Sequence, residues 1–104
     1  MRPAARREAA VLKAAEMLEA AGNVLGYPHS SSASGKGGML RELRPRRGRS
    51  PVRPLYRRIG SEFVIGAVAR SHEGRRACNA MLVEARRRLD DEQQRLEKQG
   101  SRQR

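Results

Sequence analysis

The chain is poor in cysteine and in aromatic residues, and these shortages exclude several classes of protein. Cys78 is the only cysteine, so the chain can form no internal disulfide framework and provides no CxxC pair of metal ligands. Aromatic residues are too few for a platform on which single-stranded nucleic acid stacks, and they number three: Tyr27, Tyr56 and Phe63. The two histidines lack the spacing of a metal site, so we expect no metal site and no cofactor.

Long hydrophobic segments are also missing. No run approaches the ~20 apolar residues that a membrane span requires, and no apolar segment of a secretory signal follows the first basic residues. Val, Ile, Leu and Phe together account for 18 of 104 residues, which is few for a chain with a net charge of +12. These features predict a cytoplasmic protein with no membrane partner, whose thin core is marginally stable without a binding partner.

The positive charge is concentrated in the middle of the chain. Residues 23–61 contain nine Lys or Arg and one acid, Glu42, whereas residues 1–22 contain four bases and three acids. Residues 62–104 contain ten bases and seven acids. A concentrated basic segment is typical of phosphate binding, because each neutralised phosphate releases counterions. The alternative interpretation is a solvated arginine-rich surface.

Two stretches have the hydrophobic spacing of α-helices. Over residues 4–21, apolar side chains recur at intervals of three and four in an alanine-rich stretch between Pro3 and Gly22. Over residues 76–98, apolar residues recur at helical spacing, and oppositely charged pairs stand four residues apart. The polar residues 100–104 predict a frayed tail.

Three segments between these helices are predicted to be strands. They cover residues 39–44, 52–59 and 62–69, and the last is the most apolar, so we expect it to be the central strand. Gly60 and Ser61 predict a tight hairpin between the last two strands, while Pro54 indicates an edge position or a bulge.

Residues 26–38 are rich in Gly, Pro and Ser and predict a loop. The order of elements predicts a single α+β domain over residues 1–99. It consists of an N-terminal helix, a three-stranded antiparallel sheet and a long C-terminal helix.

Arginines on the predicted strands are the strongest chemical signal in the chain. Arg41 and Arg44 lie on the first strand. By the two-residue period of a strand, Arg53 and Arg57 share one face of the second strand. Guanidinium groups bind phosphates in bidentate fashion and stabilise the charge of a phosphoryl-transfer transition state. The 2′-hydroxyl of RNA then serves as the nucleophile without a metal. Solvated arginines on an exposed face explain the same pattern.

Residues 25–56 contain four short motifs in a fixed order: LGYPHS at 25–30, ELRP at 42–45, GRSP at 48–51 and RPLY at 53–56. In this order and spacing, the stretch resembles the phage-derived HigB-type branch of the RelE/ParE toxin superfamily. No single motif is specific, but the four in order are. Compared with the usual pattern of that family, the strand that precedes the first helix is missing.

The resemblance implies a compact α+β fold like that of microbial ribonucleases, and the toxin half of a type II toxin–antitoxin pair. Toxins of this kind enter the ribosomal A site and cut mRNA without a metal. Arg44 and Arg53 carry over as catalytic positions, and His72 is a candidate general acid or base in the turn after the last strand. The candidate RNA-binding residues are Arg41, Arg46, Arg47, Arg49, Arg57, Arg70 and Arg75.

The partners that the resemblance implies are mRNA on the ribosome and a cognate helix-turn-helix antitoxin, and the oligomeric state stays open. Two other functions also stay open. The same basic fold would bind RNA or the ribosome without cutting, and ParE-like members of the superfamily poison gyrase instead of attacking RNA.

Overall fold

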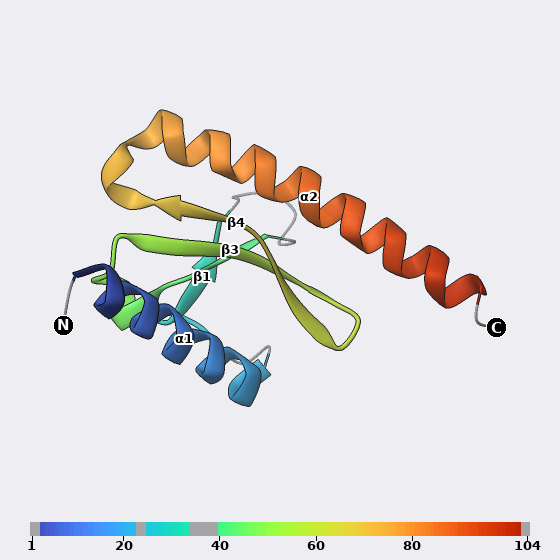
Figure 1. Cartoon of the computed structure of the whole chain (residues 1–104), viewed down its shortest axis with the longest axis horizontal. Helices are drawn as coiled ribbons and strands as arrows, with labels where there is room; N and C mark the ends of the chain where they lie inside the picture. Colours follow the sequence, from blue (N-terminus) through green and yellow to red (C-terminus); the bar gives the residue numbers. More distant parts are fainter. Residues whose placement is uncertain (1–2, 23–24, 34–39, 103–104) are drawn as a thin grey trace.

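The computed structural model describes residues 3–22, 25–33 and 40–102, and it confirms the α+β class (Figure 1). A helix covers each face of one antiparallel sheet (Figure 1). The elements in chain order are α1 (Pro3–Ala21), β1 (Ser30–Ser32), β2 (Arg41–Leu43), β3 (Val52–Ile59), β4 (Glu62–Arg70) and α2 (Arg75–Arg102). Two short 3₁₀ turns, η2 (Pro45–Gly48) and η3 (Ser71–Glu73), follow β2 and β4.

The sheet has four strands in the order β1-β2-β3-β4, so the prediction of three strands is wrong. The additional strand, β1, lies within the predicted loop 26–38 and follows α1 instead of preceding it. Its serines show no hydrophobic alternation, which is why the sequence does not reveal it. Ser30 is fully buried. Its hydroxyl is hydrogen-bonded to the Tyr56 hydroxyl at 2.5 Å and accepts a hydrogen bond from Arg41 Nε at 3.0 Å. Tertiary hydrogen bonds therefore define this strand.

The most apolar strand, β4, lies at the edge of the sheet and not at its centre as predicted. Its apolar residues are explained by α2, which packs along this strand and buries Ala85 and Leu89 completely. Gly66 permits the close approach of the helix. A Cβ at this position would lie 2.7 Å from Leu89 Cγ and 2.8 Å from the Ala85 carbonyl oxygen.

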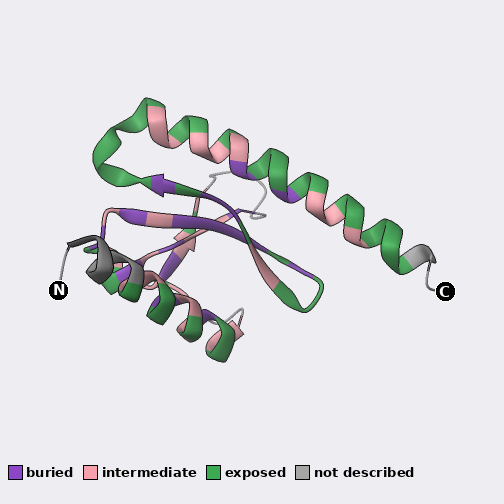
Figure 2. Cartoon of the chain, viewed as in Figure 1, coloured by how far each residue is buried: buried purple, intermediate pink, exposed green. Residues whose placement is uncertain are grey.

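A second small core lies between α1 and the opposite face of the sheet. Ala14 and Leu18 of α1 pack with Leu25, Leu43 and Tyr56. The outward sides of both helices are mostly exposed, so burial is confined to the two inner surfaces (Figure 2). Each core is thin, as the scarcity of large aliphatic residues predicts.

The pairing of β3 with β4 is irregular in its middle, near Pro54. The register shifts between Leu55, which pairs with Ala67, and Tyr56, which pairs with Ile65. The extra residue of this bulge is therefore Gly66 on β4, and not Pro54 as predicted. The pairing of β2 with β3 ends at Leu55, so Pro54 has no partner residue in β2 to which it would have to donate a hydrogen bond. Leu55 belongs to the core beneath α2, whereas Tyr56 belongs to the core beneath α1.

Helix α2 continues beyond its predicted end. Gly100, predicted to begin a frayed tail, is helical, and the C-terminal part of α2 extends past the sheet (Figure 1). The predicted charge pairs form on its surface. Glu84 accepts from Arg88 at 2.7 Å, and Asp91 accepts from Arg87 at 3.4 Å.

Candidate nucleic-acid interface

The two arginines predicted to be catalytic converge on one carboxylate. Arg44 Nη1 lies 3.0 Å from Glu42 Oε1, and Arg53 Nη1 lies 3.3 Å from the same oxygen. Glu42 pairs with Leu55 in the sheet, on the face where α2 packs over β4 and β3. The Glu42 side chain keeps 24% of its surface exposed. The carboxylate is therefore accessible and held between two permanent positive charges.

Arg53 also fixes the turn that joins β2 to β3. Its Nη2 donates to the Gly48 carbonyl at 2.8 Å, and its Nε donates to the Ser50 carbonyl at 3.2 Å. Only 14% of the Arg53 side chain is exposed, so it does not lie on an open strand face as predicted. The turn forms because a buried Ser50 accepts the Val52 N–H and Arg53 binds the free carbonyls.

Arg44 is held just as firmly. Its Nε donates to the Pro28 carbonyl at 3.1 Å, and its guanidinium carbon lies 5.0 Å from the centre of the Tyr27 ring. Gly48 makes room for this group, since a Cβ there would lie 2.4 Å from Arg44 Nη2. The LGYPHS and GRSP motifs thus contribute to the placement of Arg44. Both predicted catalytic arginines are preorganised.

The turn after β2 presents arginines without partners. Among the residues that the structure describes, no side chain forms a hydrogen bond or ion pair with Arg46, Arg47 or Arg49, and all three are exposed. Arg46 and Arg47 have left-handed backbones with φ of 56° and 59°. For non-glycine residues this conformation costs about 1–2 kcal/mol each. Strained, unpaired arginines of this kind are typical of a functional surface.

Arg41 has a structural contact in addition to its predicted role. Its Nε binds the buried Ser30 hydroxyl, which joins β1 to β2. The residue is only partly exposed. Arg41 therefore helps to hold β1 against β2, and its guanidinium is bound to Ser30 of the protein itself.

The structure buries Arg57, which was predicted to bind RNA. Only 5% of its side chain is exposed, and its Nη1 donates to Asp90 at 2.7 Å and to Gln93 at 3.2 Å. The two-residue period correctly places Arg57 on the same face as Leu55, but α2 covers that face at this point. The guanidinium consequently joins β3 to α2 and is not presented to solvent.

The remaining predicted residues, Arg70, His72 and Arg75, lie in the segment from the end of β4 to the start of α2. All three are exposed, and Arg70 Nε lies 3.8 Å from Glu73. The Ser71 N–H donates to the Pro51 carbonyl at 2.8 Å, which brings this segment to the end of the β2–β3 turn. Among the described residues, no hydrogen bond connects His72 with Glu42, Arg44 or Arg53.

Glu42 is the residue of this site that reasoning from the sequence missed. One feature of the sequence pointed to Glu42: it is the single acidic residue among residues 23–61, and it lies within the ELRP motif. In the parts of the chain that the structure describes, no group of three or more His, Cys, Asp or Glu is placed to hold a metal ion. No helix within the described ranges is long and apolar enough to span a membrane.

The resolved pKa shifts lie on α2 and not in this site. Hydrogen bonding to Arg87 lowers the pKa of Glu84, and hydrogen bonding to Arg95 lowers the pKa of Glu92. Both carboxylates are on the solvent-facing surface of the helix, so they contribute to its stability and not to chemistry at Glu42.

Comparison of the chain with models of known protein families, with curated proteins and with solved structures finds no match. The resemblance of residues 25–56 to HigB-type toxins therefore rests on those residues alone.

Proposed function

We propose that this protein binds RNA at the β2–β3 end of its sheet and cleaves it without a metal, as the toxin of a type II toxin–antitoxin pair. The observation that carries the proposal is the Glu42 carboxylate, which is accessible and held between Arg44 and Arg53. A base flanked by two guanidinium groups matches the needs of RNA cleavage by its own 2′-hydroxyl.

In this reaction Glu42 accepts the proton of the 2′-hydroxyl, and the 2′-oxygen attacks the adjacent phosphorus. The bond from phosphorus to the 5′-oxygen breaks, which leaves a 2′,3′-cyclic phosphate and a 5′-hydroxyl. Arg44 and Arg53 stabilise the charge that develops on the phosphoryl oxygens. His72, in the neighbouring η3 turn, is proposed to supply the proton of the leaving 5′-oxygen.

The unpaired arginines of the turn would hold the RNA strand beside Glu42. Arg46, Arg47 and Arg49 place three charges within a few residues of the carboxylate, and Arg70 and Arg75 extend the basic surface beyond Pro51. Electrostatic attraction from a chain with net charge +12 favours association with the ribosome, whose surface is largely phosphate.

The proposal includes mRNA on the ribosome as substrate and a helix-turn-helix antitoxin as partner, both from the resemblance of residues 25–56. The thin cores on both faces of the sheet support dependence on a partner, since binding to the native state adds stability. Adding the partner should raise the melting temperature, and an unchanged value would count against this dependence.

The decisive experiment measures cleavage of an mRNA on purified ribosomes. We expect cuts that leave 2′,3′-cyclic phosphate ends, persist in EDTA concentrations that keep ribosomes intact, and vanish when the cleaved nucleotide carries a 2′-deoxy sugar. Glu42→Gln should abolish cleavage while ribosome binding is retained. Cleavage at full rate by Glu42→Gln, or on the 2′-deoxy substrate, would refute the mechanism.

A second candidate is an RNA- or ribosome-binding protein of the same fold that does not cut. It is favoured by the fact that Arg44 and Arg53 are both already paired with Glu42, and that Arg53 also binds backbone carbonyls. Ribosome binding without cleavage would identify this candidate. DNA breaks that require gyrase would identify the third one, a ParE-like gyrase poison.

A further inference from the structure

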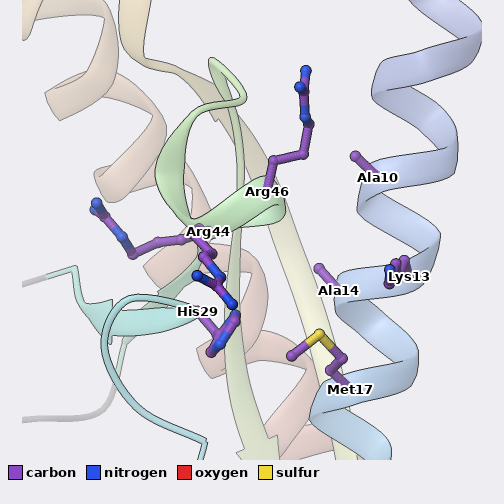
Figure 3. Close-up of a pocket in the computed structure, with 8 residues that line it drawn as sticks. Ala10, Lys13, Ala14, Met17, His29, Arg44 and Arg46 are labelled. Carbon is purple, nitrogen blue, oxygen red and sulfur yellow. The ribbon is translucent and has the colours of Figure 1, made fainter.

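A cleft of about 360 Å³ lies between α1 and the η2 turn (Figure 3). One side is formed by α1, and the other by the end of β2, the turn and the segment before β1 (Figure 3). Among the residues whose side chains the structure describes, no acidic residue lines the cleft, and the lining residues are Ala10, Lys13, Ala14, Met17, His29, Arg44, Arg46 and Arg47. Its volume is in the range of small-molecule sites.

The lining separates into a basic rim and an apolar wall. Lys13, Arg46 and Arg47 are exposed, and within the described part of the chain none of them has an acidic partner. Positive charges that line one cleft without a counterion repel one another, so an anion bound there would lower this repulsion. Ala10, Ala14 and Met17 form the wall along α1 (Figure 3). This combination suits a ligand that has both a phosphate and an apolar or aromatic part.

We propose that this cleft binds one nucleotide unit, with its phosphate at Lys13, Arg46 and Arg47 and its base against Ala14 and Met17. The nucleotide belongs either to an RNA strand or to a free nucleoside phosphate. Lys13 comes from α1, outside the basic middle segment, so only the fold brings it to these arginines. The site does not require cleavage at Glu42, although Arg44 lines the cleft and contacts Glu42.

The test uses the full chain with ¹³C-labelled methionine methyl groups. Met17 lies in the cleft, whereas Met81 belongs to α2, packs against the core on the other face of the sheet and serves as an internal control. The ligands are AMP, inorganic phosphate and a short single-stranded RNA with 2′-O-methyl sugars, which cannot be cleaved through its 2′-oxygens. We expect a saturable shift of the Met17 methyl signal, assigned with Met17→Leu, and no shift of Met81.

Variants then identify the phosphate contact. Lys13→Ala should weaken binding about tenfold, as expected for a hydrogen bond to a charged group, and should lower the salt dependence by about one phosphate contact. Arg86→Ala removes the same charge from the exposed surface of α2 and should change affinity less than twofold. A melting curve confirms that both variants are folded.

Comparison of the ligands distinguishes the source of the bound phosphate. A shift with the RNA alone assigns the cleft to a strand, and a shift with AMP assigns it to nucleotides in general; both support the proposal. The proposal is overturned if none of these ligands moves the Met17 signal, if inorganic phosphate alone moves it, or if Lys13→Ala binds as tightly as the parent. RNA cleavage with an unmoved Met17 would refute this site and leave the proposed function standing.

Discussion

The Arg57 guanidinium donates a hydrogen bond to the Asp90 carboxylate at 2.7 Å and thereby joins β3 to α2. Arg57 is almost fully buried, whereas 53% of the Asp90 side chain is exposed. A base that the strand pattern placed on a phosphate-binding face thus holds a helix against the sheet. Alternation along a strand predicts which face of the sheet an arginine lies on. Whether that arginine binds a ligand or another part of the protein depends on whether a helix covers the face, as α2 does here.

Arg57→Ala should destabilise the protein by about 2 kcal/mol, because a charge-assisted hydrogen bond and the packing of the arginine stem are both lost. Solvent at Asp90 keeps the cost below that of a fully buried pair. Urea unfolding of Arg57→Ala and of Arg86→Ala, an exposed arginine of α2, measures the difference. Equal midpoints for the two variants would contradict the structural role of Arg57.

Gly66→Ala should separate α2 from the sheet and cost about 1–3 kcal/mol, since the added methyl group meets Leu89 and the Ala85 carbonyl. At Gly26 a Cβ would have open space around it, and the backbone there needs no left-handed conformation. Gly26→Ala is therefore the matched control and should unfold at nearly the parental temperature. Thermal unfolding by circular dichroism distinguishes them, and an unaltered Gly66→Ala protein would argue against this packing.

Arg46→Gly should stabilise the fold by about 1 kcal/mol while it weakens RNA binding, because glycine adopts the left-handed backbone without strain. Arg49→Gly removes the same charge at a residue whose backbone is right-handed, so it should bring no gain in stability. Unfolding midpoints and filter binding of RNA give the two quantities. A loss of stability in Arg46→Gly would show that the turn is not strained.

Arg44→Ala and Arg53→Ala should each lower RNA cleavage by about 100-fold or more, the cost of removing one group that stabilises a transition state. Arg53→Ala should also destabilise the protein, because the Gly48 and Ser50 carbonyls lose their donor. Toxicity in cells and mRNA cleavage on ribosomes are measured for both variants, with Arg86→Ala as the control. Full toxicity of both site variants would refute the assignment of this site.

Glu84→Gln should reduce stability near pH 7 and have no effect in strong acid. Hydrogen bonding to Arg87 lowers the pKa of Glu84 below its ordinary value of 4.5. The contribution of the carboxylate is therefore complete above pH 4.5 and is lost as the pH falls through the lowered pKa. Unfolding of both proteins from pH 7 to pH 2 tests the sign. A difference that grows on acidification would contradict it.

Most of the regular structure is readable from the chain because its signals are local. Alanine-rich helical spacing predicted α1 within one residue, and an apolar segment bounded by turn residues predicted β3 as found. The hairpin at Gly60 follows from a two-residue connection, and Gly60 has a φ of 62°. The bulge near Pro54 was only partly predictable, because its extra residue, Gly66, lies on β4 across from β3.

The site itself was only half predictable. Arg44, Arg53 and the arginines of the turn were identified by charge and motif, and the structure brings Arg44 and Arg53 together at Glu42. Glu42 was missed as their common partner, because an isolated acid in a basic segment shows its role only when its neighbours across the sheet are known.

The sequence by itself determined the α+β class, the positions of both helices and the long strands, and a basic middle segment, since propensity, spacing and charge act over a few neighbouring residues. Tertiary structure alone decided that three serines form a strand, that β4 lies at an edge, and that Arg57 is buried while Arg46 is exposed. These outcomes depend on contacts between residues far apart in the chain. Ser30 reaches Tyr56 and Arg57 reaches Asp90 only when the sheet and helices have packed.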